Sequence, residues 1–222
     1  MNDKLVLIHT VSPLVDVFNT LGVGLLPGVQ LMHILDEPIL ELERQGNGLT
    51  SEASARLGTH VAAAERVGAS AALVTCSTIS PNVDDVRPQA SIPVLKIDEA
   101  MIAQAVSTGS KIGVVATAAS TLEPTHGLLQ AQADASGRVI KVELVLVENA
   151  LAALLSGDGA THDRLVKSAI LELAGRVDVV VLAQATMARV LDVLTASDCQ
   201  VPVLSSPHLA LESVRQVLAD GH

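Results

Sequence analysis

The sequence predicts an α/β protein of two pseudo-symmetric lobes, each a roughly four-stranded parallel sheet flanked by helices. Three observations lead to this fold class. Short aliphatic runs alternate with longer helical patterns, the second half of the chain repeats the first, and the apolar residues are mostly Ala, Val and Leu. Alternating strands and helices are typical of parallel sheets covered on both faces. The length of 222 residues is enough for two such lobes.

Eight short aliphatic runs are predicted to be strands. They are residues 4–8, 30–35, 71–75, 93–97, 111–116, 140–146, 177–182 and 202–205. Two apolar stripes at helical spacing predict long helices, namely Ala53, Leu57, Val61 and Ala64 in the first half, and Leu165, Ala169, Ile170 and Leu173 in the second. Thr50 or Ser51 is the predicted cap of the first helix and Thr161 that of the second.

The second half of the chain matches the first in three places, in order. Residues 4–8 match 111–115 at an offset of 107 (111 − 4), residues 71–76 match 179–184 at 108 (184 − 76), and 93–95 match 202–204 at 109 (202 − 93). A nearly constant offset favours a true repeat over a chance likeness of two α/β units. We therefore assign residues 1–100 plus 207–222 to the first lobe, to which a last helix returns, and residues 101–206 to the second.

Composition excludes several classes of partner. Lys and Arg number 14 against 24 Asp and Glu, for a net charge of −10, and such a surface repels phosphate backbones and anionic lipid. There is no Trp or Tyr on which bases could stack. We expect no nucleic-acid or membrane partner, while a homo-oligomer is compatible with the sequence. Two isolated cysteines and a first apolar run too short for a signal peptide predict a cytoplasmic protein.

The repeat predicts where a ligand binds. In open parallel sheets, ligands bind beyond the carboxyl ends of the strands, and we expect the two sets of strand ends to line one cleft. Those ends are residues 9–10, 75–78, 117–121 and 183–186, which are rich in hydroxyl groups and poor in charge. This composition suits a small carboxylate held by hydroxyls and backbone N–H groups.

Three segments resemble motifs of the Asp/Glu/hydantoin racemase superfamily. Residues 73–78, Leu-Val-Thr-Cys-Ser-Thr, are similar to the family's first cysteine motif, Cys-Asn-Thr, with Ser77 in place of Asn. Residues 181–187, Val-Leu-Ala-Gln-Ala-Thr-Met, are similar to the second motif, Leu-Gly-Cys followed by small residues. Residues 113–117 with Thr121 resemble the family's carboxylate-binding segment. The resemblance covers nearly the whole chain and agrees with the predicted fold.

The resemblance implies chemistry at the α-carbon of a small carboxylate, without a metal or an organic cofactor. Family members hold the substrate between two cysteines, one from each lobe. This sequence has Cys76 at the first position but Gln184 at the second, and a glutamine amide is neither an acid nor a base at neutral pH. His9 is the best titratable replacement for the missing thiol, provided that it reaches the cleft.

The predicted site follows from these comparisons, with Cys76 and His9 as catalytic residues. Substrate-binding residues are predicted to be Thr10, Ser77, Thr78, Thr117, Thr121, Gln184 and Thr186. A helix start soon after Cys76 would lower the pKa of its thiol, whereas the alternative is an inert buried thiol. For Thr117 and Thr121 the alternative is ordinary helix capping. Asp98 is expected only to open the next helix.

Three functions are compatible with this site. The first is a racemase-like isomerase with Cys76 as base or nucleophile. The second is a one-thiol lyase, in which Cys76 protonates the carbanion left by loss of carbon dioxide, as in the superfamily's decarboxylases of disubstituted malonates. The third is a binder or sensor of small carboxylates that has lost its catalytic activity.

Overall fold

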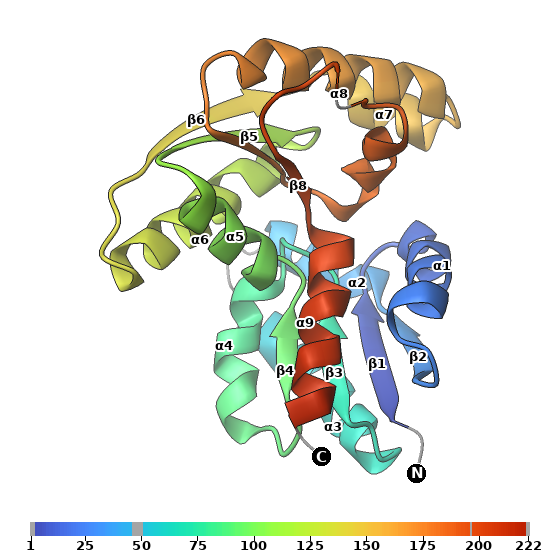
Figure 1. The fold of residues 1–222 in the computed structure, drawn as a ribbon. Helices are drawn as coiled ribbons and strands as arrows, with labels where there is room; N and C mark the ends of the chain where they lie inside the picture. Colours follow the sequence, from blue (N-terminus) through green and yellow to red (C-terminus); the bar gives the residue numbers. More distant parts are fainter. Residues whose placement is uncertain (1–2, 46–50, 196, 221–222) are drawn as a thin grey trace. The chain divides into compact units, whose positions relative to one another are not determined.

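The chain folds into two compact units, each built around a parallel sheet. The computed structural model describes residues 3–45, 51–195 and 197–220. One unit comprises Met1–Glu99 and Pro207–His222, and the other comprises Ala100–Ser206. Each unit has a four-stranded parallel sheet with helices packed on it, so the predicted fold class is confirmed (Figure 1).

The sheet of the first unit has the strand order β2-β1-β3-β4. Its strands are β1 (Lys4–His9), β2 (Gln30–Leu35), β3 (Ala71–Val74) and β4 (Val94–Lys96). Its helices are α1 (Pro13–Leu25), α2 (Glu37–Gln45), α3 (Ser51–Arg66), α4 (Val83–Val86) and α9 (Ser206–Asp220), with short 3₁₀ turns η1 (Ser80–Asn82) and η2 (Arg87–Gln89). The buried central strands β1 and β3 are nearly continuous apolar runs, as a sheet covered on both faces requires.

The sheet of the second unit has the equivalent order β6-β5-β7-β8. Its strands are β5 (Lys111–Ala116), β6 (Lys141–Leu146), β7 (Val179–Leu182) and β8 (Val203–Ser205). Its helices are α5 (Glu99–Thr108), α6 (Leu122–Ala135), α7 (Ala150–Leu155) and α8 (Gly159–Ala174), with 3₁₀ segments η3 (Ala119–Thr121) and η4 (Ala185–Asp192). The matching strand orders give the sequence repeat a structural counterpart.

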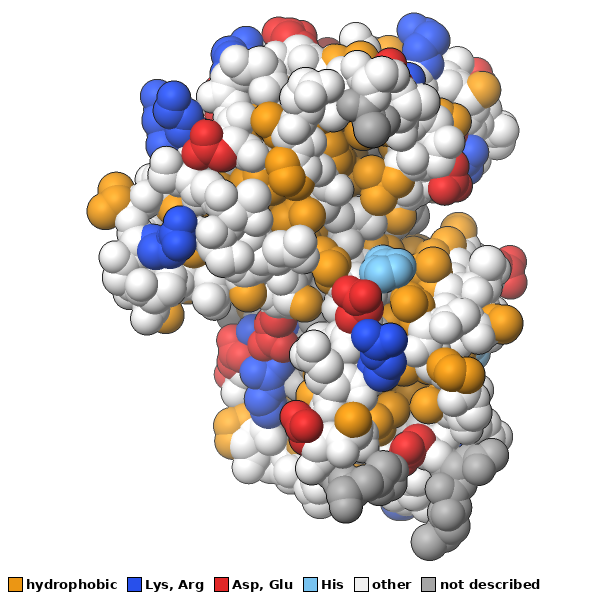
Figure 2. Space-filling view, in the orientation of Figure 1, with side chains coloured by type: hydrophobic (Ala, Val, Ile, Leu, Met, Phe, Trp, Pro, Cys, Tyr) orange, Lys and Arg blue, Asp and Glu red, His pale blue; other side chains and the backbone are white. Residues whose placement is uncertain are grey.

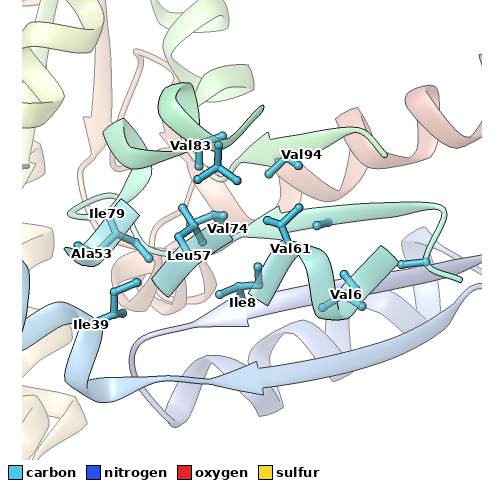
Figure 3. Close-up of a cluster of buried hydrophobic side chains, with 14 residues drawn as sticks. Val6, Ile8, Ile39, Ala53, Leu57, Val61, Val74, Ile79, Val83 and Val94 are labelled. Carbon is cyan, nitrogen blue, oxygen red and sulfur yellow. The ribbon is translucent and has the colours of Figure 1, made fainter. Parts of the chain in front are cut away.

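One face of the first sheet packs against α3 and α4. The buried residues of this cluster are Val6, Ile8, Ala72, Val74 and Val94 from the strands, with Ile39, Ala53, Leu57, Val61, Ala64, Ala69, Ile79, Val83 and Val86 around them (Figure 3). The predicted stripe of the first long helix is therefore the buried face of α3. Ser51 begins that helix, while Thr50, its other predicted cap, lies outside the described residues.

The second unit buries an equivalent cluster between its sheet and α8. Val115, Val180 and Leu182 contribute from the strands, and Ile170 and Leu173 from α8. Asp158, rather than the predicted Thr161, caps this helix, because its carboxylate accepts a hydrogen bond from the Thr161 backbone N–H at 3.0 Å. Among the described residues, no helix combines the length and the hydrophobicity that crossing a lipid bilayer requires.

We predict that Gly113→Ala destabilises the protein by about 1–3 kcal/mol through overpacking. A Cβ atom on Gly113, in the buried strand β5, would lie 2.4 Å from Cδ2 of Leu173 in α8. Urea denaturation followed by circular dichroism measures the effect, because the chain has no Trp or Tyr for fluorescence. The control is Gly127→Ala in α6, where an added Cβ meets nothing within 4 Å. This change should stabilise the protein by about 0.5–1 kcal/mol, because alanine favours a helix over glycine. Equal effects of the two changes would contradict the prediction.

Candidate active site

Cys76 lies two residues after Val74, the last residue of β3, with the buried Thr75 between them. Its thiol is free and half-buried, and it packs against the cluster of hydrophobic residues shared with α3 and α4. The side chain therefore points to the same face of the sheet as Val74. Ser77 and Thr78, which follow it, are also half-buried. A thiol that is held by packing yet partly open to solvent is suited to meet a small ligand.

The chain after Cys76 forms a short turn instead of the predicted helix. The Ile79 backbone N–H donates to the Cys76 carbonyl at 3.2 Å, and a three-residue 3₁₀ turn and the four-residue α4 follow. Pro81 and Pro88 limit regular hydrogen bonding here, since proline has no N–H to donate. A helix this short has too few aligned peptide dipoles to act strongly on the thiol.

His9 lies on the opposite face of the first sheet from Cys76. Its ring is fully buried, with Nδ1 2.7 Å from the Thr75 hydroxyl and Nε2 2.9 Å from Nδ1 of His33. The Thr75 hydroxyl donates to the Ile8 carbonyl at 3.0 Å, so His9 Nδ1 must be the donor to Thr75. Both ring nitrogens are thus occupied, which favours a role for His9 in holding the end of β3 over direct proton transfer.

This arrangement continues to the surface through His33. Its Nδ1 donates to His9, and its Nε2 lies 3.0 Å from Oδ1 of Asn19 in α1, a contact that becomes a hydrogen bond to neutral His33 when the Asn19 amide is turned to present its NH₂ group. Burial and the charge of His33 lower the pKa of His9 to about 4. His9 is therefore neutral at physiological pH, and it keeps the tautomer that these hydrogen bonds select.

Gln184 and Thr117 form the corresponding site in the second unit. Val115 pairs with Leu182, so Thr117 and Gln184 lie opposite each other two residues beyond this pair, where both strands have ended. The Thr117 backbone N–H and hydroxyl both donate to Oε1 of Gln184, at 2.6 and 3.1 Å. A backbone N–H can only donate, so the amide orientation is settled, and the NH₂ group of Gln184 is left to donate elsewhere.

The remaining predicted residues differ in their freedom to bind a ligand. Thr10 is buried, and its hydroxyl has no hydrogen-bond partner among the described residues. Thr121 is also buried, but its hydroxyl donates to the Ala118 carbonyl at 2.8 Å and so stabilises the turn in which Thr121 lies. Thr186 is half-buried at the start of η4.

Two carboxylates that sequence reasoning did not assign to the site lie at the same edge of the first sheet. Asp36 follows β2 and binds Arg56 and His60 of α3, each at 2.5 Å. Burial opposes ionisation, but the hydrogen bonds from these two residues lower the pKa of Asp36 below its usual value. Asp98 follows β4 and, as expected, directly precedes α5, but its carboxyl group is almost fully buried. In the described ranges, no three His, Cys, Asp or Glu side chains group as metal ligands do.

We predict that the stabilising effect of His9 is lost as the pH falls from about 6.5 towards 4. Between these values the unfolded chain binds a proton that the folded chain excludes, so the free energy of unfolding decreases with falling pH. Relative to His9→Gln, the wild-type protein should lose about 2 kcal/mol between pH 7.5 and pH 5. Urea denaturation at both pH values measures this difference. If the free energies of unfolding of the two proteins changed in parallel with pH, the predicted effect of His9 would be excluded.

We predict that Gln184→Ala destabilises the second unit by about 1–2 kcal/mol, because the Thr117 backbone N–H loses its acceptor. Gln184→Glu retains an acceptor oxygen and should therefore lose clearly less free energy of unfolding than Gln184→Ala. Urea denaturation followed by circular dichroism compares the two variants. An equal loss of stability in both would show that the hydrogen bond from the Thr117 N–H does not stabilise the unit.

Comparisons with known proteins relate this fold to racemases. The family model of Asp/Glu/hydantoin racemase matches residues 32–214. No curated protein sequence matches the chain. Among solved structures, an allantoin racemase from Klebsiella pneumoniae is similar with a TM-score of 0.76 and 17% identity, covering 99% of this chain and 89% of that one. A glutamate racemase from Bacillus anthracis has a TM-score of 0.73 and 16% identity, covering 99% and 82%. For an aspartate racemase from Picrophilus torridus, the TM-score is 0.73 and the identity 12%, covering 98% and 94%. Since the family model spans most of the chain, the protein belongs to the Asp/Glu/hydantoin racemase family.

Proposed function

We propose that the protein is a cofactor-independent isomerase that acts at the α-carbon of a small carboxylate, with Cys76 as its acid/base group or nucleophile. The observation that carries this proposal is the free, half-buried thiol of Cys76 at the end of β3, in a chain that belongs to a racemase family. A thiolate at this position removes the α-proton and leaves a carbanion that the substrate's carboxyl group stabilises. Return of a proton to the α-carbon completes the reaction.

The amide of Gln184 takes the place of a second thiol and binds the substrate instead of exchanging protons with it. Its oxygen is occupied by Thr117, which leaves two N–H donors for a carboxylate or carbonyl oxygen. Donors aimed at oxygens that gain negative charge in the transition state are a major source of catalysis. The enzyme we propose is therefore asymmetric, with one proton-transfer thiol and one hydrogen-bonding amide.

Hydroxyl groups complete the proposed substrate site. Thr10, Ser77, Thr78 and Thr186 are the members of the predicted set for which the described contacts leave the hydroxyl available. Local donors matter because the net charge of −10 does not attract an anion. Acidic and basic side chains are interspersed over the face drawn in Figure 2. The two free thiols agree with a cytoplasmic location, which we propose as well.

A one-thiol lyase is the second candidate, and the fixed amide of Gln184 is the observation that favours it. Loss of carbon dioxide from a disubstituted malonate leaves a carbanion that needs only one proton donor. Cys76 would supply that proton while the Gln184 amide holds the remaining carboxylate. No second thiol is needed for this reaction, in agreement with the sequence at position 184.

We predict that Cys76→Ala abolishes turnover, with a rate reduction of at least about 10³-fold, because it removes the only proposed proton-transfer thiol. The wild-type protein is incubated in D₂O with each enantiomer of aspartate, glutamate and allantoin, and with a disubstituted malonate. Proton NMR records deuterium at the α-carbon, and released carbon dioxide is measured in parallel. Cys199→Ala is the matched control, since that cysteine is only partly buried beside the hydrophobic cluster of the second unit and has no proposed role in turnover.

The outcomes separate the candidates. Exchange into both enantiomers supports the isomerase, and carbon dioxide release without exchange supports the lyase. An unchanged rate in Cys76→Ala would exclude both. A ligand that raises the melting temperature without any turnover would favour a non-catalytic binder.

A further inference from the structure

The segment η4, which follows Gln184, is an unusually long 3₁₀ helix. It comprises eight residues, Ala185–Asp192, whereas 3₁₀ helices rarely exceed about four residues because their hydrogen bonds have poor geometry. It begins directly after Gln184, and the Met187 backbone N–H donates to the Gln184 carbonyl at 3.0 Å. The position of the Gln184 backbone therefore depends on η4, and η4 depends on contacts with its surroundings.

An ion pair ties η4 to the first turns of α8. Nε of Arg189 lies 2.9 and 3.1 Å from the two carboxylate oxygens of Asp163. The guanidinium group packs on the backbone at Gly159, the first residue of α8, where an added Cβ would lie 2.6 Å from a terminal nitrogen of Arg189. The buried side chains of Met187 and Val190 belong to the same hydrophobic cluster as those of α8. Arg189 is thus the polar anchor of η4.

The acidic partner in this ion pair is buried and held from a second side. Asp163 is buried, whereas the Arg189 side chain is half-exposed. Oδ1 of Asp163 also lies 2.8 Å from Nδ1 of the fully buried His162. Because a carboxylate only accepts hydrogen bonds, Nδ1 of His162 is the donor and orients the carboxylate. A buried carboxylate is costly without its cationic partner, so Asp163 favours one position of Arg189.

A continuous series of contacts leads from this ion pair to the amide of Gln184. Arg189 holds η4 on α8, and the first turn of η4 holds the Gln184 carbonyl. The Thr117 N–H holds the side-chain oxygen of Gln184 at the other end. All of these contacts lie within the second unit. The direction of the two amide N–H groups is therefore determined from both ends of the residue.

We propose that Arg189 is a positioning residue, which through its ion pair with Asp163 holds the Gln184 amide in the orientation that binds the substrate. This inference rests on the proposed function, in which the N–H groups of Gln184 bind a carboxylate or carbonyl oxygen. It deepens that function by naming the residues that aim these donors. Arg189 acts through Gln184 and needs no contact with the substrate.

The test is the hydrogen exchange of the Thr117 backbone N–H, followed by NMR, which needs no substrate. The acceptor of this N–H is the side-chain oxygen of Gln184, so its exchange rate reports on the position of the amide. In Arg189→Ala, exchange at Thr117 should accelerate by about tenfold or more, because the amide is no longer held in place. Backbone amides in the ladder between β5 and β7 should stay within about twofold of their wild-type rates.

Three further variants separate positioning from a general loss of stability. Arg189→Lys keeps a positive charge for Asp163 and should restore most of the protection at Thr117. In Asp163→Asn the ion pair is already lost, so adding Arg189→Ala should accelerate exchange clearly less than it does in the wild type. Asp192→Asn, which changes the other charged residue of η4, should leave the exchange unchanged. Circular dichroism confirms that each variant is folded.

The kinetic consequence is measured on the reaction that the deuterium-exchange and carbon dioxide assays identify. Arg189→Ala should lower kcat/KM by about 10- to 100-fold, because a misplaced donor no longer meets the substrate oxygen. Arg189→Lys should recover most of this loss. In a Gln184→Ala background, Arg189→Ala should cause no further loss, whereas a merely structural contribution would lower kcat/KM in both backgrounds.

Unchanged exchange at Thr117 in a folded Arg189→Ala would overturn the proposal, as would an equal acceleration at every amide of the sheet. A full further loss of kcat/KM in the Gln184→Ala background would also overturn it. None of these results would affect the proposed role of Cys76. Conversely, turnover that persists in Cys76→Ala would refute the proposed function, while accelerated exchange at Thr117 would still show that Arg189 holds the amide.

Discussion

The parallel register of β1, β3 and β4 is the constraint on which the candidate site depends. Because Ile8 pairs with Val74 and Val74 with Lys96, these strands end at one level. The chemistry-bearing residues follow two positions later, beyond the last ladder pairs, where the backbone is released from the sheet. Packing of α3 and α4 on that face then holds the strand ends. The position of the Cys76 thiol therefore depends on the stability of this hydrophobic cluster.

Most of the fold was predictable because it depends on patterns that are local in sequence. The eight strands are found within a few residues of their predicted positions, and the stripe of Ala53, Leu57, Val61 and Ala64 is buried as expected. The segment after Cys76 was predicted less well. Hydroxyl-rich residues before Pro81 indicated a helix start, but a second proline at position 88 limits the helix to one turn.

The site was only partly predictable, because side-chain partners depend on the register between strands. Sequence alone singled out Cys76 and Gln184 as candidates through the repeat, but it did not predict the hydrogen bond from Thr117 that orients the amide. It placed His9 at a strand end without showing on which face its ring would lie. Asp98 does precede α5 as the sequence predicted, but its nearly complete burial depends on contacts that are distant in sequence, such as the hydrogen bond from Ser80.

The hydrogen bonds between Thr117 and Gln184 also determine what a thiol at position 184 would require of its neighbours. A cysteine at position 184 offers only a sulfur atom, which is a weak acceptor, so that change alone leaves the N–H of the buried Thr117 poorly paired. The loop before α6 would have to rearrange together with the substitution. A thiol at position 184 therefore requires a second change that gives the Thr117 N–H a new acceptor, so the residues at these two positions constrain each other.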